Sequence, residues 1–254
     1  MLRNWGLADT KVGGENMKRV AVLQSNYIPW KGYFDIINSV DEFVWYDDVQ
    51  YTKHDWRNRN RIKTSHGIQW LTIPCRGKGK PLTNQVGIDD PSWQKKHWQT
   101  LSRAYSHAPC FDDFRDYFEE LYLGRHWKML YEVNRAFVER ICRDILGIST
   151  RFVDSAQYSL ESNKQERLLD LLGQLGADRY LSGPAAKDYL DEREFVSRGI
   201  ELVWMDYNGY PVYPQLHGRF EHKVSILDLI FNVGDRACWY IWGWREGKSE
   251  PKSS

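Results

Sequence analysis

Three groups of polar and aromatic residues have the chemistry of a ligand site, and each follows a short apolar run. The first follows Val20-Ala21-Val22-Leu23, and its candidate binding residues are Gln24, Asn26, Tyr27, Trp30 and Lys31. A loop after the first strand of an α/β sheet is where amides at the start of a helix meet phosphate. Asn26 and Lys31 can add donors there. The alternative is a loop whose side chains satisfy only its own backbone.

The second group follows the apolar run from Glu42 to Tyr46. Its members are Asp47, Asp48, Gln50, Tyr51, Lys53, His54, Trp56, Arg57, Asn58, Arg59, Asn60 and Lys63. Two adjacent carboxylates at a strand end can bind Mg²⁺ or accept ligand hydroxyls. Arginine offers a planar fork for carboxylate or phosphate, and His54 titrates near neutral pH. The alternative is the solvated face of an edge strand.

The third group follows the run Arg179 to Leu181. Its members are Ser182, Gly183, Lys187, Tyr213, Gln215 and His217. Lys187 lies after a strand and at the start of a helix, which suits a polyphosphate. His217 is expected in a loop over the site, and a structural histidine is the alternative. No histidine or cysteine has metal-ligand spacing, so the sequence predicts no metal site built from them.

Short apolar runs that alternate with helical patterns must position these groups. A strand, a loop, an amphipathic helix and a second strand occupy residues 20–46, which is a βαβ unit with a right-handed crossover. Residues 92–146 have helical spacing, and strand-like runs return near residues 150, 179 and 201. The sequence therefore predicts an α/β fold, with a Rossmann-like parallel sheet and a helical insert.

This pattern also predicts the organisation of the chain. We expect residues 1–16 to be a disordered leader and residues 17–90 the first half of the α/β domain. The helical insert is expected at 91–148, the second half of the domain at 149–240, and a frayed tail at 241–254.

Composition limits the classes of partner. The chain has 254 residues with 35 basic and 34 acidic side chains, so no global field favours nucleic acid. No run approaches the roughly 20 apolar residues of a membrane span. Four scattered cysteines, with no CxxC pair, are typical of reduced thiols in the cytoplasm. The sequence predicts a cytoplasmic protein and leaves the oligomeric state open.

Long motifs carry a resemblance to a known family. The runs LQSNYIPWKGYFDIINSVDEFVWYDDVQYTKHDWRNRNRIK, LGADRYLSGPAAKDYLD, GIELVWMDY and YPQLHGRFEHKVSILDLIFNVG closely resemble the WbqC-like family over about residues 18–235. That family is associated with gene clusters for bacterial O-antigen and other surface polysaccharides. The resemblance implies attachment of an acyl or aminoacyl group to an amino sugar.

A weaker similarity links the chain to the pantothenate synthetase and nucleotidylyltransferase group. WKGYFDIINS is similar to its HxGHxxLIxxA segment, and LSGPAAKDY to its phosphate-binding FGxKDYQ segment. This similarity implies ATP with magnesium as a possible cofactor and Lys187 as the phosphate-binding lysine. The chain departs from that pattern, because Trp30 and Tyr33 stand at the two histidine positions.

The family resemblance implies an enzyme that forms an amide on a nucleotide-linked amino sugar, and the polar groups above supply its candidate residues. The candidate catalytic residues are His54, Asp48, Asp47 and Lys53, with His54 as the base that deprotonates the amine. Trp30, Tyr51 and Trp56 are expected to stack on sugar or base. His54→Ala and Asp48→Asn are expected to abolish turnover without unfolding. The alternative is a non-catalytic nucleotide- or sugar-binding scaffold.

Overall fold

The computed structural model describes residues 17–76, 79–247 and 249–251, so the predicted leader lies outside the described residues. Five parallel strands form its central sheet: β1 (Arg19–Leu23), β2 (Glu42–Trp45), β7 (Arg151–Asp154), β8 (Arg179–Ser182) and β9 (Glu201–Trp204). Their order is β7-β2-β1-β8-β9. The predicted α/β fold with a parallel sheet is confirmed.

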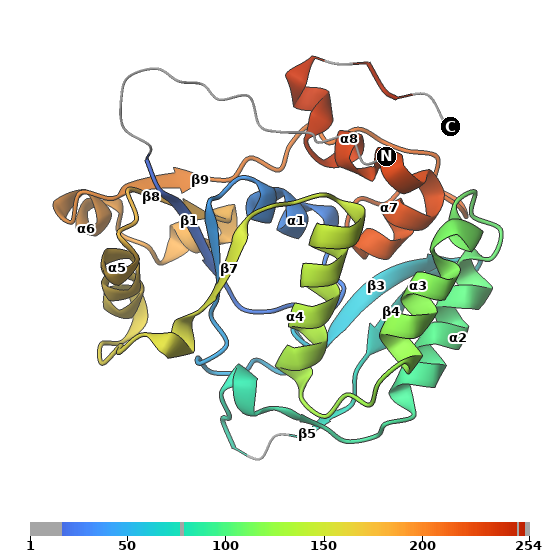
Figure 1. The fold of residues 1–254 in the computed structure, drawn as a ribbon, viewed down its shortest axis with the longest axis horizontal. Helices are drawn as coiled ribbons and strands as arrows, with labels where there is room; N and C mark the ends of the chain where they lie inside the picture. Colours follow the sequence, from blue (N-terminus) through green and yellow to red (C-terminus); the bar gives the residue numbers. More distant parts are fainter. Residues whose placement is uncertain (1–16, 77–78, 248, 252–254) are drawn as a thin grey trace.

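Alternating side chains along each strand pack on opposite faces of the sheet, as the two-residue period of a strand requires. Val20 and Val22 join one core cluster, whereas Ala21 joins the other. The first cluster is covered by α5 (Lys164–Leu175) and α6 (Glu192–Ser197). The second is covered by α1 (Lys31–Asn38), α7 (Ile226–Val233) and α8 (Ala237–Ile241). Figure 1 shows this division, with α5 and α6 on one side and the other helices opposite.

Helices between β6 and β7 enlarge the second cluster. They are α2 (Trp93–Tyr105), α3 (Phe111–Leu123) and α4 (Leu130–Arg140), the last continued by a π-helix at Ile141–Ile145. Helical structure was expected at residues 92–146, and large apolar side chains at helical spacing explain why it forms there. Trp93, Tyr105 and Phe118 are each at most 1% exposed.

A two-stranded antiparallel hairpin lies outside the main sheet, where the sequence leaves a polar binding segment and the solvated face of an edge strand as alternatives. It consists of β3 (Arg59–Thr64) and β4 (Gly67–Thr72). The pattern of β3 hides its strand character, because Asn60 occupies a buried position that usually carries an apolar residue. The Asn60 amide donates to the carbonyls of Tyr27 and Ile28, each at 3.0 Å, and this explains its burial.

Short elements complete the described chain. These are a hairpin of β5 (Cys75–Arg76) with β6 (Gly87–Ile88), and 3₁₀ turns at Thr83–Gln85, Ser155–Gln157, Pro184–Asp188, Gly234–Arg236 and Gly243–Glu246. Among the described helices, none combines the length and apolar character needed to cross a bilayer.

The start of the predicted frayed tail is packed. Ile241 is fully buried and Trp242 is 9% exposed. Arg245 forms an ion pair with the buried Asp35 of α1, with Nη2 2.8 Å from Oδ2. Composition could not show this contact, because the polar character of the segment conceals a charge that has a buried partner far back in the chain.

Candidate functional site

The strand order defines the place where a ligand is expected. From β1 the chain adds β2 and β7 on one side of the sheet and β8 and β9 on the other. Ligands of such sheets bind beyond the carboxyl ends of the strands where the order reverses. Here those ends are the segments Gln24–Asn26 after β1 and Ser182–Gly183 after β8.

Arg57 is held against the first of these segments by neutral acceptors. Its Nε and Nη2 donate to the Gln24 amide oxygen at 3.0 and 2.7 Å, and Nη1 donates to the Asn26 amide oxygen. The ion pair with Asp55 is long, at 3.9 Å. The guanidinium is therefore fixed in direction while much of its charge remains available to an anionic ligand.

The segment after β8 contributes Tyr189, two residues beyond Lys187. Burial raises the pKa of Tyr189, and the charge of Arg57 opposes that rise. Hydrogen bonds join Arg57 to the segment around Asn26, whereas no hydrogen bond or ion pair among the described residues joins Lys187 to either of them. Lys187 itself is exposed, with Nζ 5.5 Å from the Trp204 ring centre.

Aromatic rings line the start of α1. The Trp30 ring lies 5.1 Å from that of Tyr207, edge to face. A Cβ on Gly183 would lie 3.8 Å from the Tyr207 hydroxyl. A Cβ on Gly32 would lie 2.3 Å from the Trp30 indole, so only glycine allows the indole to cover the first turn of the helix.

Lys31 is buried beside these rings, and no ion pair joins it to a described carboxylate. It is 3% exposed, and Nζ donates to the Pro211 carbonyl at 3.3 Å. The ammonium lies 4.8 and 5.4 Å from the ring centres of Tyr210 and Tyr213. Burial lowers the pKa of Lys31 to about 8, although Asp35 opposes the shift. Such a perturbed lysine is typical of functional sites.

His222 is a residue of this region that the candidate list omits. Its Nδ1 is buried without a hydrogen-bond partner. Burial lowers its pKa first, and the charge of Lys31 lowers it further. His222 stands within the motif YPQLHGRFEHKVSILDLIFNVG, but nothing in its local spacing distinguishes it from His217. Its proximity to Lys31 arises only in the folded chain.

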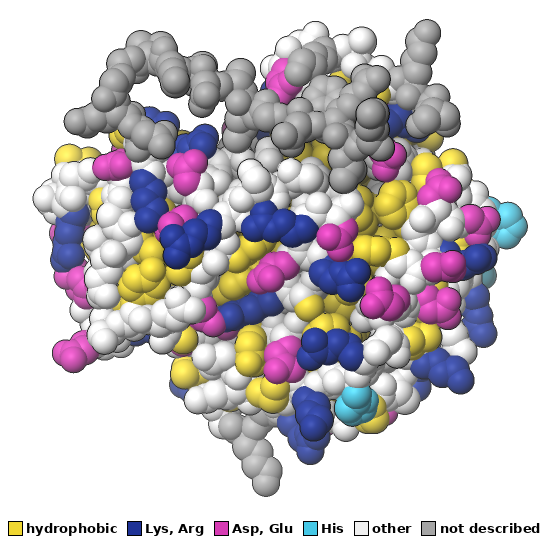
Figure 2. All heavy atoms as spheres, viewed as in Figure 1, with side chains coloured by type: hydrophobic (Ala, Val, Ile, Leu, Met, Phe, Trp, Pro, Cys, Tyr) yellow, Lys and Arg dark blue, Asp and Glu magenta, His cyan; other side chains and the backbone are white. Residues whose placement is uncertain are grey.

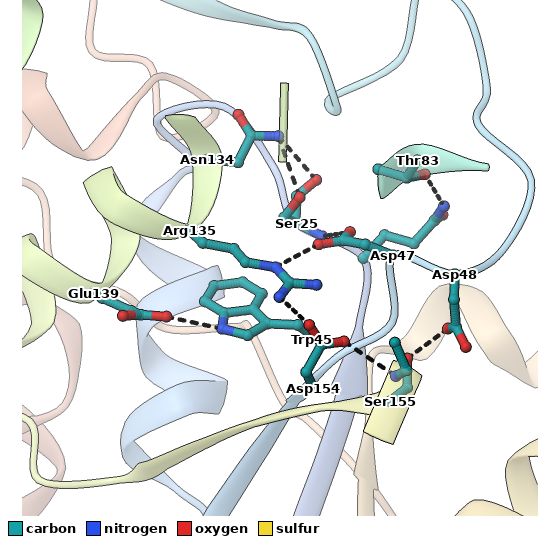
Figure 3. Close-up of polar contacts among 12 residues, drawn as sticks. Ser25, Trp45, Asp47, Asp48, Thr83, Asn134, Arg135, Glu139, Asp154 and Ser155 are labelled. Carbon is teal, nitrogen blue, oxygen red and sulfur yellow. Dashed lines mark hydrogen bonds and ion pairs between the residues drawn. The ribbon is translucent and has the colours of Figure 1, made fainter. Parts of the chain in front are cut away.

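Asp47 and Asp48 are both engaged in ion pairs with arginines. Figure 3 shows Asp47 with Arg135, and Asp48 with the Ser155 hydroxyl. Asp47 is fully buried and accepts from Arg135 Nε and from the Ser25 amide, both at 2.8 Å. Arg135 also binds Asp154, and Asp48 binds Arg167 and Ser155. Burial raises the pKa of Asp47, against the effect of Arg135.

This geometry does not favour the magnesium interpretation of the two aspartates, because each carboxylate already has an arginine as its counter-ion. Within the described residues, no group of three or more histidine, cysteine, aspartate or glutamate side chains could hold a metal ion.

His54 and Lys53 lie on an exposed turn. His54 has a positive φ of 57°. The structure gives neither side chain a hydrogen bond or ion pair with another described residue. Their assignment to catalysis stays a prediction without a supporting contact.

Several other predicted binding residues support the fold around the site. The Tyr27 hydroxyl contacts His97 Nδ1 at 2.9 Å and the Tyr122 hydroxyl at 2.7 Å, inside the core. Tyr51 is 6% exposed, and the Asn58 amide donates to the Ile73 carbonyl at 2.9 Å. The carbonyl of Gln50 accepts from the Gln24 amide at 3.3 Å. Ser182 is 3% exposed.

Three predicted residues form hydrogen bonds with helices away from the switch point: Tyr213 and Gln215 with α7, and His217 with α2. The Tyr213 hydroxyl donates to buried Asp228 at 2.7 Å, and Gln215 binds the same carboxylate at 2.6 Å. His217 Nε2 contacts the Ala104 carbonyl at 2.9 Å. Tyr213 alone of the three also contacts the Lys31 region.

The similarity to pantothenate synthetase implies ATP with magnesium, and the residues present do not fit its histidine pair. The Trp30 indole covers Gly32, and the Tyr33 hydroxyl donates to the Gln24 carbonyl at 2.8 Å. Both positions therefore serve packing, and neither offers a cation to departing phosphates.

A cavity of about 1030 Å³ lies elsewhere, around β5, β6 and the segment before α4. It contains none of the predicted site residues. Cys75 lines it, and burial raises the pKa of this thiol to about 12, which makes it a poor nucleophile.

Comparison with known proteins agrees with the sequence motifs. The model of the WbqC-like protein family matches residues 24–240. The uncharacterized protein Rv1507c of Mycobacterium tuberculosis is 50% identical over 227 residues, which cover 89% of this chain and 98% of that protein. No solved structure matches the chain.

Proposed function

We propose that this chain, which belongs to the WbqC-like protein family, forms an amide on a nucleotide-linked amino sugar in the cytoplasm, during synthesis of a surface polysaccharide. One observation carries the proposal: Arg57 and Lys31 lie at the switch point of the parallel sheet, and neither has a close carboxylate as its counter-ion. Such a region suits a substrate with negative charge. Trp30 and Tyr207 offer aromatic faces for a sugar ring.

Amide formation needs a base, because an ammonium group cannot attack an acyl donor. We assign this role to Lys31 in place of His54. A lysine with a pKa of about 8 is partly neutral near pH 7 and can accept a proton. His54 is exposed and has no described contact with the site. Since the histidine positions do not fit ATP, the acyl or aminoacyl donor would arrive already activated. The amine nitrogen would bond to the acyl carbon, the bond to the activating group would break and release that group, and Lys31 would take the proton of the amine.

The test combines binding with product analysis. Calorimetry with the wild-type protein should show binding of an amino-sugar nucleotide. The same titration with ATP should show no binding. Incubation with activated acyl and aminoacyl donors should give the mass of an amide product. Arg57→Gln should weaken sugar-nucleotide binding, while Arg115→Gln, on the exposed surface of α3, should not.

The contrary outcomes are also defined. A protein that binds the sugar nucleotide but forms no amide with any donor would be a binding protein of the polysaccharide machinery. That result would remove the enzymatic proposal. Turnover that persists in Lys31→Met but is lost in His54→Ala would return the role of base to His54.

A further inference from the structure

The outer face of the β3–β4 hairpin carries arginine and tryptophan side chains whose arrangement no packing requirement explains. The strand register places Arg61 opposite Trp70, and Arg59 two pairs further along on the same face. Trp56, from the turn before β3, joins them. We call these four residues, Trp56, Arg59, Arg61 and Trp70, the hairpin face.

The four side chains form a stack that is open to solvent. The Arg59 guanidinium lies 4.3 Å from the ring centre of Trp70, and the rings of Trp56 and Trp70 lie 5.4 Å apart at 35°. The Arg61 guanidinium is 5.8 and 5.9 Å from the two rings. Trp56 and Trp70 remain 40% and 42% exposed.

Neither arginine has a counter-ion in the described structure. No ion pair or side-chain hydrogen bond joins Arg59 or Arg61 to another described residue, and the Nε of each is buried without a partner. Unpaired arginines are unusual in a chain whose other guanidinium groups mostly pair with carboxylates. Two positive charges beside two exposed indoles are complementary to a ligand that has a flat ring and adjacent negative charges.

Another arginine of the chain shows that a cation–π contact does not require this exposure. The Arg125 guanidinium lies 4.0 Å from the ring centre of Trp127, but Trp127 is only 3% exposed. In that pair, packing of other side chains covers the Trp127 ring. The hairpin face has the same kind of contact, with its aromatic surface left free.

We propose that the hairpin face binds the nucleoside diphosphate part of the sugar nucleotide. The base stacks on the exposed indoles, as bases do on aromatic side chains elsewhere, and the two guanidinium groups bind the diphosphate. The identity of the ligand rests on the proposed function, whereas the assignment of the subsite rests on the hairpin.

The hairpin face is continuous with the switch point. The Trp56 carbonyl accepts from the Tyr27 amide at 3.0 Å, which fixes the turn to the loop after β1. Trp56 directly precedes Arg57. A nucleotide on the hairpin face therefore has its sugar within reach of the Arg57 region, which the proposed function requires.

Single-stranded nucleic acid is the competing occupant, because it also offers bases and phosphates. Its binding sites follow the backbone with an extended positive groove. This chain has a net charge of +1, and Figure 2 shows basic and acidic side chains interspersed on the face in view. The observations therefore favour a ligand with two phosphates over a polymer.

Calorimetric titration with UDP, GDP, CDP and dTDP, and with the corresponding nucleosides, tests the assignment. Trp70→Ala should weaken both the preferred diphosphate and its nucleoside by at least about fivefold. The double variant R59Q/R61Q should weaken the diphosphate by about a hundredfold and the nucleoside little. It should also reduce the dependence of diphosphate affinity on salt. The matched control Arg125→Gln should leave every affinity unchanged.

The outcomes separate this inference from the proposed function. If wild type forms the amide but diphosphate affinity is the same in Trp70→Ala and R59Q/R61Q, the hairpin subsite is wrong and the proposed function stands. If the diphosphate binds through the hairpin but no amide forms, the subsite stands and the proposed enzyme does not. Tighter binding of a short oligothymidylate than of any diphosphate would assign the face to nucleic acid instead.

Discussion

Two charged regions lie at the carboxyl ends of the strands. In one of them the charged side chains pair with counter-ions, and in the other most of them do not. Beyond β2 and β7, Asp47 and Asp154 share Arg135, and Asp48 has Arg167. Beyond β1 and along the hairpin, Lys31, Arg57, Arg59 and Arg61 have carbonyl or amide oxygens and aromatic rings as partners, with one long ion pair from Arg57. We call these the carboxylate region and the cation region.

The difference separates residues that hold the fold from residues available to a ligand. A buried charge with a bonded counter-ion is stabilised within the protein, and removing one partner leaves the other uncompensated. A buried or fixed cation without a carboxylate lowers stability unless an anion binds. The Asp47-Asp48 pair stands out in the sequence, yet it belongs to the first class.

The largest expected effect is on the carboxylate region. Asp47→Ala leaves Arg135 without its buried partner and the Ser25 amide without its acceptor, so the free energy of unfolding should fall by about 3–5 kcal/mol. Urea denaturation measures this change. Asp116→Ala is the control, because that side chain is 87% exposed and should cost less than about 0.5 kcal/mol. A loss below about 1 kcal/mol for Asp47→Ala would break the comparison.

In the cation region, removing a charge is expected to raise the free energy of unfolding. The pKa of Lys31 in the folded protein, about 8, is below its ordinary value of 10.5, because burial disfavours the ammonium. At and below pH 7 this costs the fold up to about 3 kcal/mol. Lys31→Met should therefore raise the free energy of unfolding at pH 7 by up to that amount, while turnover is lost.

The pH dependence of the free energy of unfolding shows whether the buried charge of Lys31 causes this difference in stability. In the wild type the cost disappears as pH rises from about 8 towards 10.5, because the unfolded chain also becomes neutral. The advantage of Lys31→Met in urea denaturation should shrink over the same window. Lys95→Met, at an exposed position of α2, is the control, and it should leave the free energy of unfolding and its pH dependence close to those of the wild type. Equal pH profiles for wild type and Lys31→Met would show that Lys31 carries no buried charge.

For Arg57→Gln an effect of intermediate size is expected, on ligand affinity and not on stability. Loss of a charge-assisted contact should weaken sugar-nucleotide binding by about 10–100-fold, which corresponds to about 1.4–2.7 kcal/mol. Stability should change by less than about 1 kcal/mol, because the partners of Arg57 are neutral amides that can reorient towards water. Calorimetry and urea denaturation together give the two values. Lost stability with unchanged affinity would move Arg57 into the class that holds the fold.

The smallest effect is expected at His54. His54→Gly should raise the free energy of unfolding by about 0.5–1 kcal/mol, because glycine adopts a φ of 57° without strain. His54→Ala should keep turnover if Lys31 is the base. Loss of turnover in a folded His54→Ala protein would support the role that the sequence predicts for His54, and its pH–rate profile would then report that group.

The sequence predicts the central sheet better than it predicts the candidate site. Apolar runs such as Val20 to Leu23 predict the parallel strands, because strands buried on both faces leave a continuous apolar pattern. The strand β3 is hidden, since Asn60 satisfies loop carbonyls from a buried strand position. The partners of Asp47 and Lys31 are also hidden, because Arg135 and His222 come from distant elements. Residue type identifies a charged side chain as a candidate site residue, but only the folded chain shows whether that side chain has a counter-ion.

The contact between Asp35 and Arg245 bears on how the chain matures during synthesis. Asp35 lies in the first helix, is fully buried, and also binds the Tyr210 hydroxyl at 2.5 Å. The helix that carries Lys31 can therefore form this ion pair only after Arg245, 210 residues later in the chain, has been synthesised. A chain that ends before Arg245 would leave the Asp35 carboxylate without its ion-pair partner, and burying that unpaired charge would destabilise the first helix.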